Sequence, residues 1–123
     1  MRRTIAFVMC LLIVISAMSL SAFAGSQTKS GTYNSYNYSC TLSRYVSSAS
    51  ASMTYGSNTS TISTSGYVVA ENVYSGDSYQ ASLSTSGTRS ISKSASPRTN
   101  YRFTTASCSY YVGSSKVCSI GPL

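Results

Sequence analysis

The stretch TISTSG, residues 61–66, returns in nearly the same form as SLSTSG, residues 82–87. Each copy holds one aliphatic residue, Ile62 or Leu83, among small hydroxyl-bearing residues. Side chains alternate between the two faces of a β-strand, so one apolar side chain faces the interior while the hydroxyls beside it face water. The repeated stretch therefore predicts two half-buried strands. We expect Gly87 to be a turn residue, and Gly66 to be either a turn or a bulge inside one long strand.

The same period of two recurs along the chain. Residues 36–42 and 49–55 carry Tyr, Cys, Leu, Ala or Met at every second position, with Ser, Thr or Asn between them. No window shows a convincing helical period, and residues typical of turns separate the runs. We expect strands at about 33–43, 47–55, 59–65, 67–74, 78–85, 88–95, 100–112 and 116–120. The predicted fold class is all-β, a small antiparallel β-sandwich of seven or eight strands, with an up-and-down β-barrel as the alternative.

The first 24 residues contain the three parts of a secretory signal peptide. Arg2 and Arg3 precede an apolar run at residues 5–15, and Ala22-Phe23-Ala24 forms an A-x-A cleavage site. The apolar run is shorter than the roughly 20 residues of a membrane-spanning helix, so an uncleaved anchor is the weaker alternative. We expect cleavage between Ala24 and Gly25, and a secreted, extracellular protein of bacterial type, with the cell envelope as a further expected location.

Downstream of this segment we expect a flexible tail at residues 25–31 and a single domain at residues 32–123. Leu, Ile, Val and Phe are scarce in this part of the chain, which is a warning of disorder. Eleven tyrosines offset it, because their rings supply much surface that can be buried.

Basic residues outnumber acidic ones. Without the first 24 residues, seven Lys or Arg remain against Glu71 and Asp77, a net charge of +5. Such a balance favours anionic partners. A basic residue beside an aromatic ring can hold phosphate groups and stack on flat groups. We therefore predict an anionic-ligand site near Pro97, made of Lys93, Arg98, Tyr101 and Arg102. A merely solvated basic surface is the alternative.

The residues needed for catalysis are nearly absent. The chain has no His, so the commonest general base is missing. Glu71 and Asp77 are its only acidic side chains, and they flank a predicted turn, where solvated charges are usual. We expect no enzyme, no catalytic residues and no cofactor. The cysteines lack the paired spacing of zinc ligands, so we expect no metal either.

Three cysteines follow the predicted cleavage site, and Cys10 precedes it. An odd number in an oxidising compartment indicates one disulfide and one free thiol. We expect the bond to involve Cys40, with Cys108 as its first partner and Cys118 as the alternative, because this closes a long loop. A Cys108–Cys118 disulfide is a further alternative, because a hairpin with Tyr111 opposite Ser115 would place Cys108 directly opposite Cys118.

These observations predict a secreted, non-enzymatic binding or cell-envelope-associated protein with affinity for anionic surface polymers or glycans. A bacteriocin-like or membrane-active cationic protein is the alternative, supported by size, export and charge. We expect no specific recognition of nucleic acid. Contact with a membrane and the oligomeric state stay open.

Overall fold

The computed structural model describes residues 25–123, so the predicted signal peptide, its cleavage residue Ala24 and Cys10 lie outside the described residues. Within residues 25–123, nine strands follow one another along the chain. Their bounds are β1 Gly25–Tyr33, β2 Tyr36–Arg44, β3 Ala49–Tyr55, β4 Ile62–Asn72, β5 Ser78–Ser82, β6 Thr85–Gly87, β7 Ser90–Ala95, β8 Tyr101–Val112 and β9 Ser115–Ile120.

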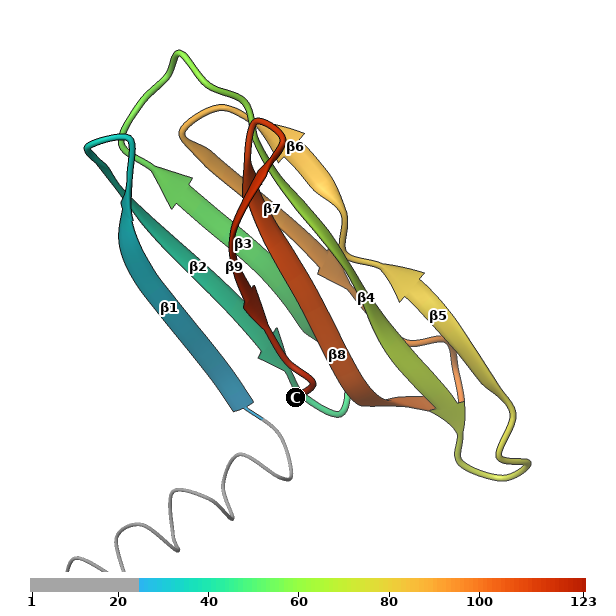
Figure 1. Cartoon of the computed structure of the whole chain (residues 1–123). Coiled ribbons are helices and arrows are strands. Elements are labelled where there is room, and N and C mark those ends of the chain that lie inside the picture. Colours follow the sequence, from blue (N-terminus) through green and yellow to red (C-terminus); the bar gives the residue numbers. More distant parts are fainter. Residues whose placement is uncertain (1–24) are drawn as a thin grey trace, which may run out of the picture.

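The strands form two antiparallel sheets that pack face to face (Figure 1). Sheet A has the order β1-β2-β3-β7. Sheet B has the order β5-β4-β8-β9, and the short strand β6 pairs with β4 beyond the end of β5. The prediction of a small all-β sandwich is confirmed. Two strands expected on either side of Gly66 are one strand, β4, in which Gly66 pairs with Cys108.

The two copies of the repeated stretch pair with each other. In the antiparallel register of β4 and β6, Ile62 lies opposite Gly87 and Thr64 lies opposite Thr85. The Thr64 hydroxyl donates a hydrogen bond of 2.8 Å to the carbonyl oxygen of Leu83. Ile62 and Leu83 are both fully buried. The aliphatic residue of each copy therefore faces the core, as the alternation predicts.

Residues 25–31 are not a flexible tail, which corrects our expectation. They belong to β1, which pairs along its whole length with β2, from Gly25 opposite Arg44 to Tyr33 opposite Tyr36. Side-chain hydrogen bonds accompany the pairing: the Thr28 and Thr41 hydroxyls lie 2.9 Å apart. β1 is an edge strand with exposed positions on both faces, so it carries no alternating apolar residues. For this reason the sequence did not predict it as a strand.

The core between the sheets contains tyrosines whose hydroxyls reach backbone carbonyl groups. Tyr110 on β8 is fully buried, and its hydroxyl donates a hydrogen bond of 2.6 Å to the carbonyl oxygen of Thr41 on β2. The Tyr55 hydroxyl donates to the carbonyl oxygen of Tyr33 at 2.8 Å. Such rings fill space as apolar residues do, while the partner for each hydroxyl removes the cost of burying it.

One basic side chain is also part of the interior. Arg44, at the end of β2, is 4% exposed. Its Nε donates to the carbonyl oxygen of Leu123 at 2.9 Å and its Nη1 to that of Phe103 at 3.2 Å. Among residues 25–123, every buried side-chain nitrogen and oxygen has a hydrogen-bond partner. Arg44 thus ties β2 to β8 and to the chain beyond β9, and it is not available to a surface ligand.

The cysteines differ from our expectation. Cys40, Cys108 and Cys118 are free thiols, so the structure does not contain the predicted Cys40–Cys108 disulfide. The hairpin register that would place Cys108 opposite Cys118 is also wrong. A register shift between Tyr110 and Tyr111 places Cys118 opposite Tyr110, and Cys108 opposite Ile120.

Gly66 gives a direct test of the packing of β4 against β8. A Cβ atom at this position would lie 2.6 Å from the Ser107 carbonyl oxygen and 2.8 Å from the Cys108 Sγ. Because the first of these is backbone, we expect Gly66→Ala to lower the free energy of unfolding in urea by about 1–3 kcal/mol. Gly56→Ala is the matched control: its Cβ would make an ordinary contact of 3.5 Å. Equal unfolding midpoints for the two variants would contradict this account.

The buried thiols predict a loss of stability in alkali. Burial raises the pKa of Cys40, Cys108 and Cys118, and that of Tyr110. An unfolded chain releases thiol protons from about pH 8.5, while the folded chain retains them, so the free energy of unfolding falls as pH rises above this value. We expect a lower urea midpoint at about pH 10 than at about pH 7 under reducing conditions. Replacing Cys40 and Cys108 by Ala should flatten this dependence, and a midpoint constant with pH would refute it.

Candidate functional site

The outward side of sheet A carries small, uncharged polar groups. The inward positions of β2 and β3 are buried, including Cys40, Leu42, Ala51 and Met53. The alternate positions of the four strands face outward, and we call them the hydroxyl face. They are Ser26, Thr28, Ser30 and Thr32 on β1, Asn37, Ser39, Thr41 and Ser43 on β2, Ser50, Ser52 and Thr54 on β3, and Ser90, Ser92 and Ser94 on β7.

The strand register arranges these groups in rows across the sheet. Thr28 lies opposite Thr41, Thr41 opposite Ser52, and Ser52 opposite Ser92. The neighbouring rows are Ser30-Ser39-Thr54-Ser90 and Ser26-Ser43-Ser50-Ser94. Adjacent strands in a sheet lie about 4.8 Å apart and every second residue about 6.8 Å along a strand, so the hydroxyls form a regular two-dimensional array.

The outward side of sheet B has a different composition. There β4 carries Tyr67 and Glu71, β8 carries Arg102, and β9 carries Lys116. Glu71 and Arg102 lie opposite each other in the strand register. Charged and aromatic groups are thus mixed on this side in the usual way, and the uniform neutrality of the hydroxyl face is specific to sheet A.

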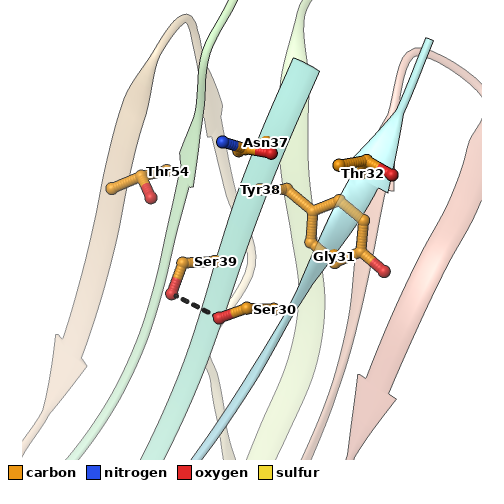
Figure 2. A pocket seen from close by; sticks show the side chains of 7 residues that line it. All are labelled: Ser30, Gly31, Thr32, Asn37, Tyr38, Ser39 and Thr54. Atoms are coloured by element: carbon orange, nitrogen blue, oxygen red, sulfur yellow. Dashed lines mark hydrogen bonds between the residues drawn. The ribbon is translucent and has the colours of Figure 1, made fainter. Parts of the chain in front are cut away.

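A shallow depression of about 480 Å³ lies at one end of the hydroxyl face. Figure 2 shows the seven residues that line it: Ser30, Gly31 and Thr32 from β1, Asn37, Tyr38 and Ser39 from β2, and Thr54 from β3. The Ser30 hydroxyl donates to that of Ser39 at 3.5 Å. Gly31 leaves room for the ring of Tyr38, whose hydroxyl would lie 2.6 Å from a Cβ at this position. All polar groups of the lining are uncharged.

A second depression of about 260 Å³ lies at the opposite end of the same strands. Its lining includes Ser43, Ser50 and Ser94, which form one row of the hydroxyl face, and the ring of Tyr45. Tyr45 is 47% exposed. The hydroxyl face is therefore bounded at both ends by a hollow, and the second hollow includes the exposed ring of Tyr45.

The structure brings together two of the four residues predicted to bind an anion. The Arg98 guanidinium lies 4.0 Å from the centre of the Tyr79 ring, and the Arg98 backbone N–H donates to the Tyr79 hydroxyl at 2.8 Å. Tyr101 packs edge-on against the same ring, with 5.0 Å between the ring centres. Tyr79 thus joins Arg98 and Tyr101 into one cluster. Tyr79 was not among the predicted site residues, because it lies on β5, far from Arg98 and Tyr101 in the sequence.

The other two predicted residues lie elsewhere. Lys93 is on β7, opposite the buried Ala51, so it occupies an inward position of an edge strand although its side chain is exposed. Lys29 occupies the corresponding kind of position on β1, the other edge strand of sheet A. An inward-facing charge on an edge strand hinders pairing with a second chain. Arg102 faces outward on sheet B beside Glu71.

The two acidic side chains of the chain, Glu71 and Asp77, lie away from the hydroxyl face. Glu71 lies on β4 and Asp77 in the turn before β5, where its backbone carbonyl accepts a hydrogen bond from the Asn72 N–H at 2.7 Å. Within residues 25–123, no group of three or more His, Cys, Asp or Glu side chains is placed to hold a metal ion. The same residues contain no helix long and apolar enough to cross a membrane.

Comparison of the chain with protein-family models, with curated proteins and with solved structures gives no match.

Proposed function

We propose that this is a non-enzymatic binding protein whose hydroxyl face holds glycans. The observation that carries the proposal is the array itself: thirteen Ser and Thr and one Asn occupy every outward position of the four strands in sheet A. A serine or threonine hydroxyl both donates and accepts hydrogen bonds, and so does a sugar hydroxyl. A surface of such groups is complementary to a neutral polyhydroxyl chain.

The arrangement also keeps the cost of binding low. The hydroxyls project from strands that are already ordered, and a Ser side chain has little rotamer freedom to lose. A hydrogen bond that replaces one to water contributes only about 0.5–1.5 kcal/mol, so affinity requires many contacts along an extended ligand. From Asn37 to Ser43 the face spans about 20 Å. We therefore infer that the ligand is a polysaccharide lying along the strands, with the depressions at either end receiving substituents.

The predicted export of the chain bears on which glycans it would meet. A signal peptide at residues 1–24 would bring the hydroxyl face outside the cell, where polymers of the cell envelope are the most abundant glycans. We therefore include secretion and association with the cell envelope in the proposed function.

An arginine placed in the middle of the hydroxyl face tests the proposal. Ser52 lies on the central strand β3, and we expect Ser52→Arg to reduce retention on insoluble polysaccharides such as cellulose, chitin or peptidoglycan by about tenfold or more. Ser109→Arg is the matched control, since Ser109 faces outward on the central strand β8 of sheet B. Retention of the unmodified protein should change little between about 0.05 M and about 0.5 M NaCl, because no charge takes part.

Two outcomes would contradict glycan binding by the hydroxyl face. If Ser52→Arg and Ser109→Arg bind equally well, or if the unmodified protein binds none of these polymers, the hydroxyl face is only a solvated surface. Circular dichroism and urea unfolding of both variants separate lost binding from lost folding.

The cluster of Arg98, Tyr79 and Tyr101 supports a second candidate, binding of an anionic envelope polymer such as teichoic acid. A guanidinium held over a ring is pre-positioned for a phosphate, and the Arg98 side chain is exposed. This candidate retains the predicted preference for anionic partners. The centre of the site is Arg98, in place of the four residues predicted from the sequence.

Charge removal tests the second candidate separately. We expect Arg98→Gln to lose most binding to teichoic acid, and the unmodified protein to lose binding steeply as salt rises, because exposed charges are screened within about 8 Å at physiological salt. Lys116→Gln, on β9, is the control. Leakage of dye from anionic lipid vesicles, without retention on the polymer, would instead favour the membrane-active alternative. Full retention by Arg98→Gln would reject an electrostatic site at this cluster.

A further inference from the structure

The two sheets meet along one side of the sandwich, where β1 and β2 of sheet A face β9 of sheet B. We call this side the seam. Three side-chain hydrogen bonds cross it. The Tyr33 hydroxyl donates to the Ser115 Oγ at 3.0 Å, the Tyr38 hydroxyl to the Val117 carbonyl oxygen at 3.2 Å, and the Lys29 Nζ to the Ser119 carbonyl oxygen at 2.8 Å. These bonds fix the height of β9 relative to β1 and β2.

The last two of these bonds bracket a pair of cysteines. Cys118 lies between Val117 and Ser119, the two residues that accept them. On the other sheet, Lys29 is the register partner of Cys40, and Tyr38 precedes Cys40 by two positions on the same face of β2. Cys40 and Cys118 are therefore held at the same level of the seam, one from each sheet.

Both side chains point into the space between the sheets. Cys40 has no exposed surface and belongs to the core. Cys118 lies opposite the buried Tyr110, so it takes the inward face of β9, and it is partly exposed because β9 is an edge strand. The thiols interact directly: Cys118 helps to raise the pKa of Cys40, while Cys40 and Lys29 counteract the increase that burial causes in the pKa of Cys118.

Cys108 is placed differently. It lies opposite Ile120, one inward position away from Cys118 on the neighbouring strand. Such diagonal neighbours have Cα atoms about 7–8 Å apart, beyond the usual limit of about 7 Å for a disulfide. Its Sγ lies over Gly66, 2.8 Å from where a Cβ would be, and so is turned along sheet B toward β4. The missing side chain of Gly66 provides the space that this thiol fills.

We propose that Cys40 and Cys118 form a disulfide across the seam when the protein is oxidised, and that Cys108 stays a buried thiol. The oxidant is a disulfide compound such as glutathione disulfide. The partly exposed Cys118 thiolate attacks one sulfur of the oxidant and releases one thiol. The Cys40 thiol loses its proton and attacks the Cys118 sulfur of the mixed disulfide, which releases the second thiol. Two protein thiols are thus oxidised by two electrons, and one disulfide is reduced to two thiols.

The bond would close a long loop, from the second strand to the last. Loop closure of this length restricts the unfolded chain strongly. It would also join β2 of sheet A to the edge strand β9 of sheet B, at the side where the three side-chain hydrogen bonds cross. The proposal is independent of any glycan-binding role, because the thiols lie on the opposite side of sheet A from the hydroxyl face.

Peptide mapping of the purified protein decides between the pairings. The folded, reduced protein is incubated with glutathione disulfide, alkylated in denaturant and digested with trypsin under non-reducing conditions. Cleavage after Lys and Arg places each cysteine on its own peptide: Cys40 on residues 30–44, Cys108 on 103–116, Cys118 on 117–123 and Cys10 on 4–29. We expect peptide 30–44 linked to peptide 117–123, and peptide 103–116 alkylated.

Any other linkage overturns the proposal, and so does alkylation of all three peptides after prolonged oxidation. Thermal unfolding gives an independent readout: oxidation should raise Tm on the order of 10 °C, and a reductant should reverse the shift. Cys118→Ser should abolish the shift, whereas Cys108→Ala should retain it. A Cys108→Ala protein that no longer responds to the oxidant, or a Cys118→Ser protein that still does, would contradict the assignment.

Discussion

The hydrogen bond from the Tyr110 hydroxyl to the Thr41 carbonyl oxygen joins the middle of one sheet to the middle of the other. Tyr110 is also the largest fully buried side chain within residues 25–123. A chain with few large aliphatic residues must use such rings to fill its core, and each buried hydroxyl then needs a partner. Tyr33, Tyr38 and Tyr55 meet the same requirement with acceptors on other strands. Burial of apolar surface is non-directional, so these directed contacts help to fix the relative position of the two sheets and with it the seam.

The alternation of side chains in the sequence was enough to predict strands and a sandwich, because one half-buried face leaves a period of two. It did not predict β1, whose positions at the sheet edge need no apolar residue. Strand register is also missing from a single sequence, since it depends on contacts between distant segments. Thus the sequence indicated that TISTSG and SLSTSG are strands, but not that Thr64 and Thr85 lie opposite each other. The shift between Tyr110 and Tyr111, which separates Cys108 from Cys118, has no local signal either.

The same limits apply to the candidate sites. Proximity in the sequence suggested that Lys93, Arg98, Tyr101 and Arg102 act together, but alternation sends Tyr101 and Arg102 to opposite faces of β8, and Lys93 belongs to the other sheet. Tyr79, which joins Arg98 to Tyr101, comes from a strand far from them in the chain. In the sequence, the residues of the hydroxyl face are only scattered Ser and Thr with no sign of a shared surface. Four strands had to be placed side by side before these residues formed rows.

The neutrality of the hydroxyl face makes the distribution of charge on the molecule strongly uneven. Of the seven Lys and Arg in residues 25–123, Arg44 is buried and the other six occupy inward positions, loops or the outward side of sheet B. Near a negatively charged surface, attraction would act on these groups and not on the hydroxyl face. The resulting torque would turn sheet A away from that surface. Adsorption through these basic groups would therefore leave the hydroxyl face oriented away from the charged surface.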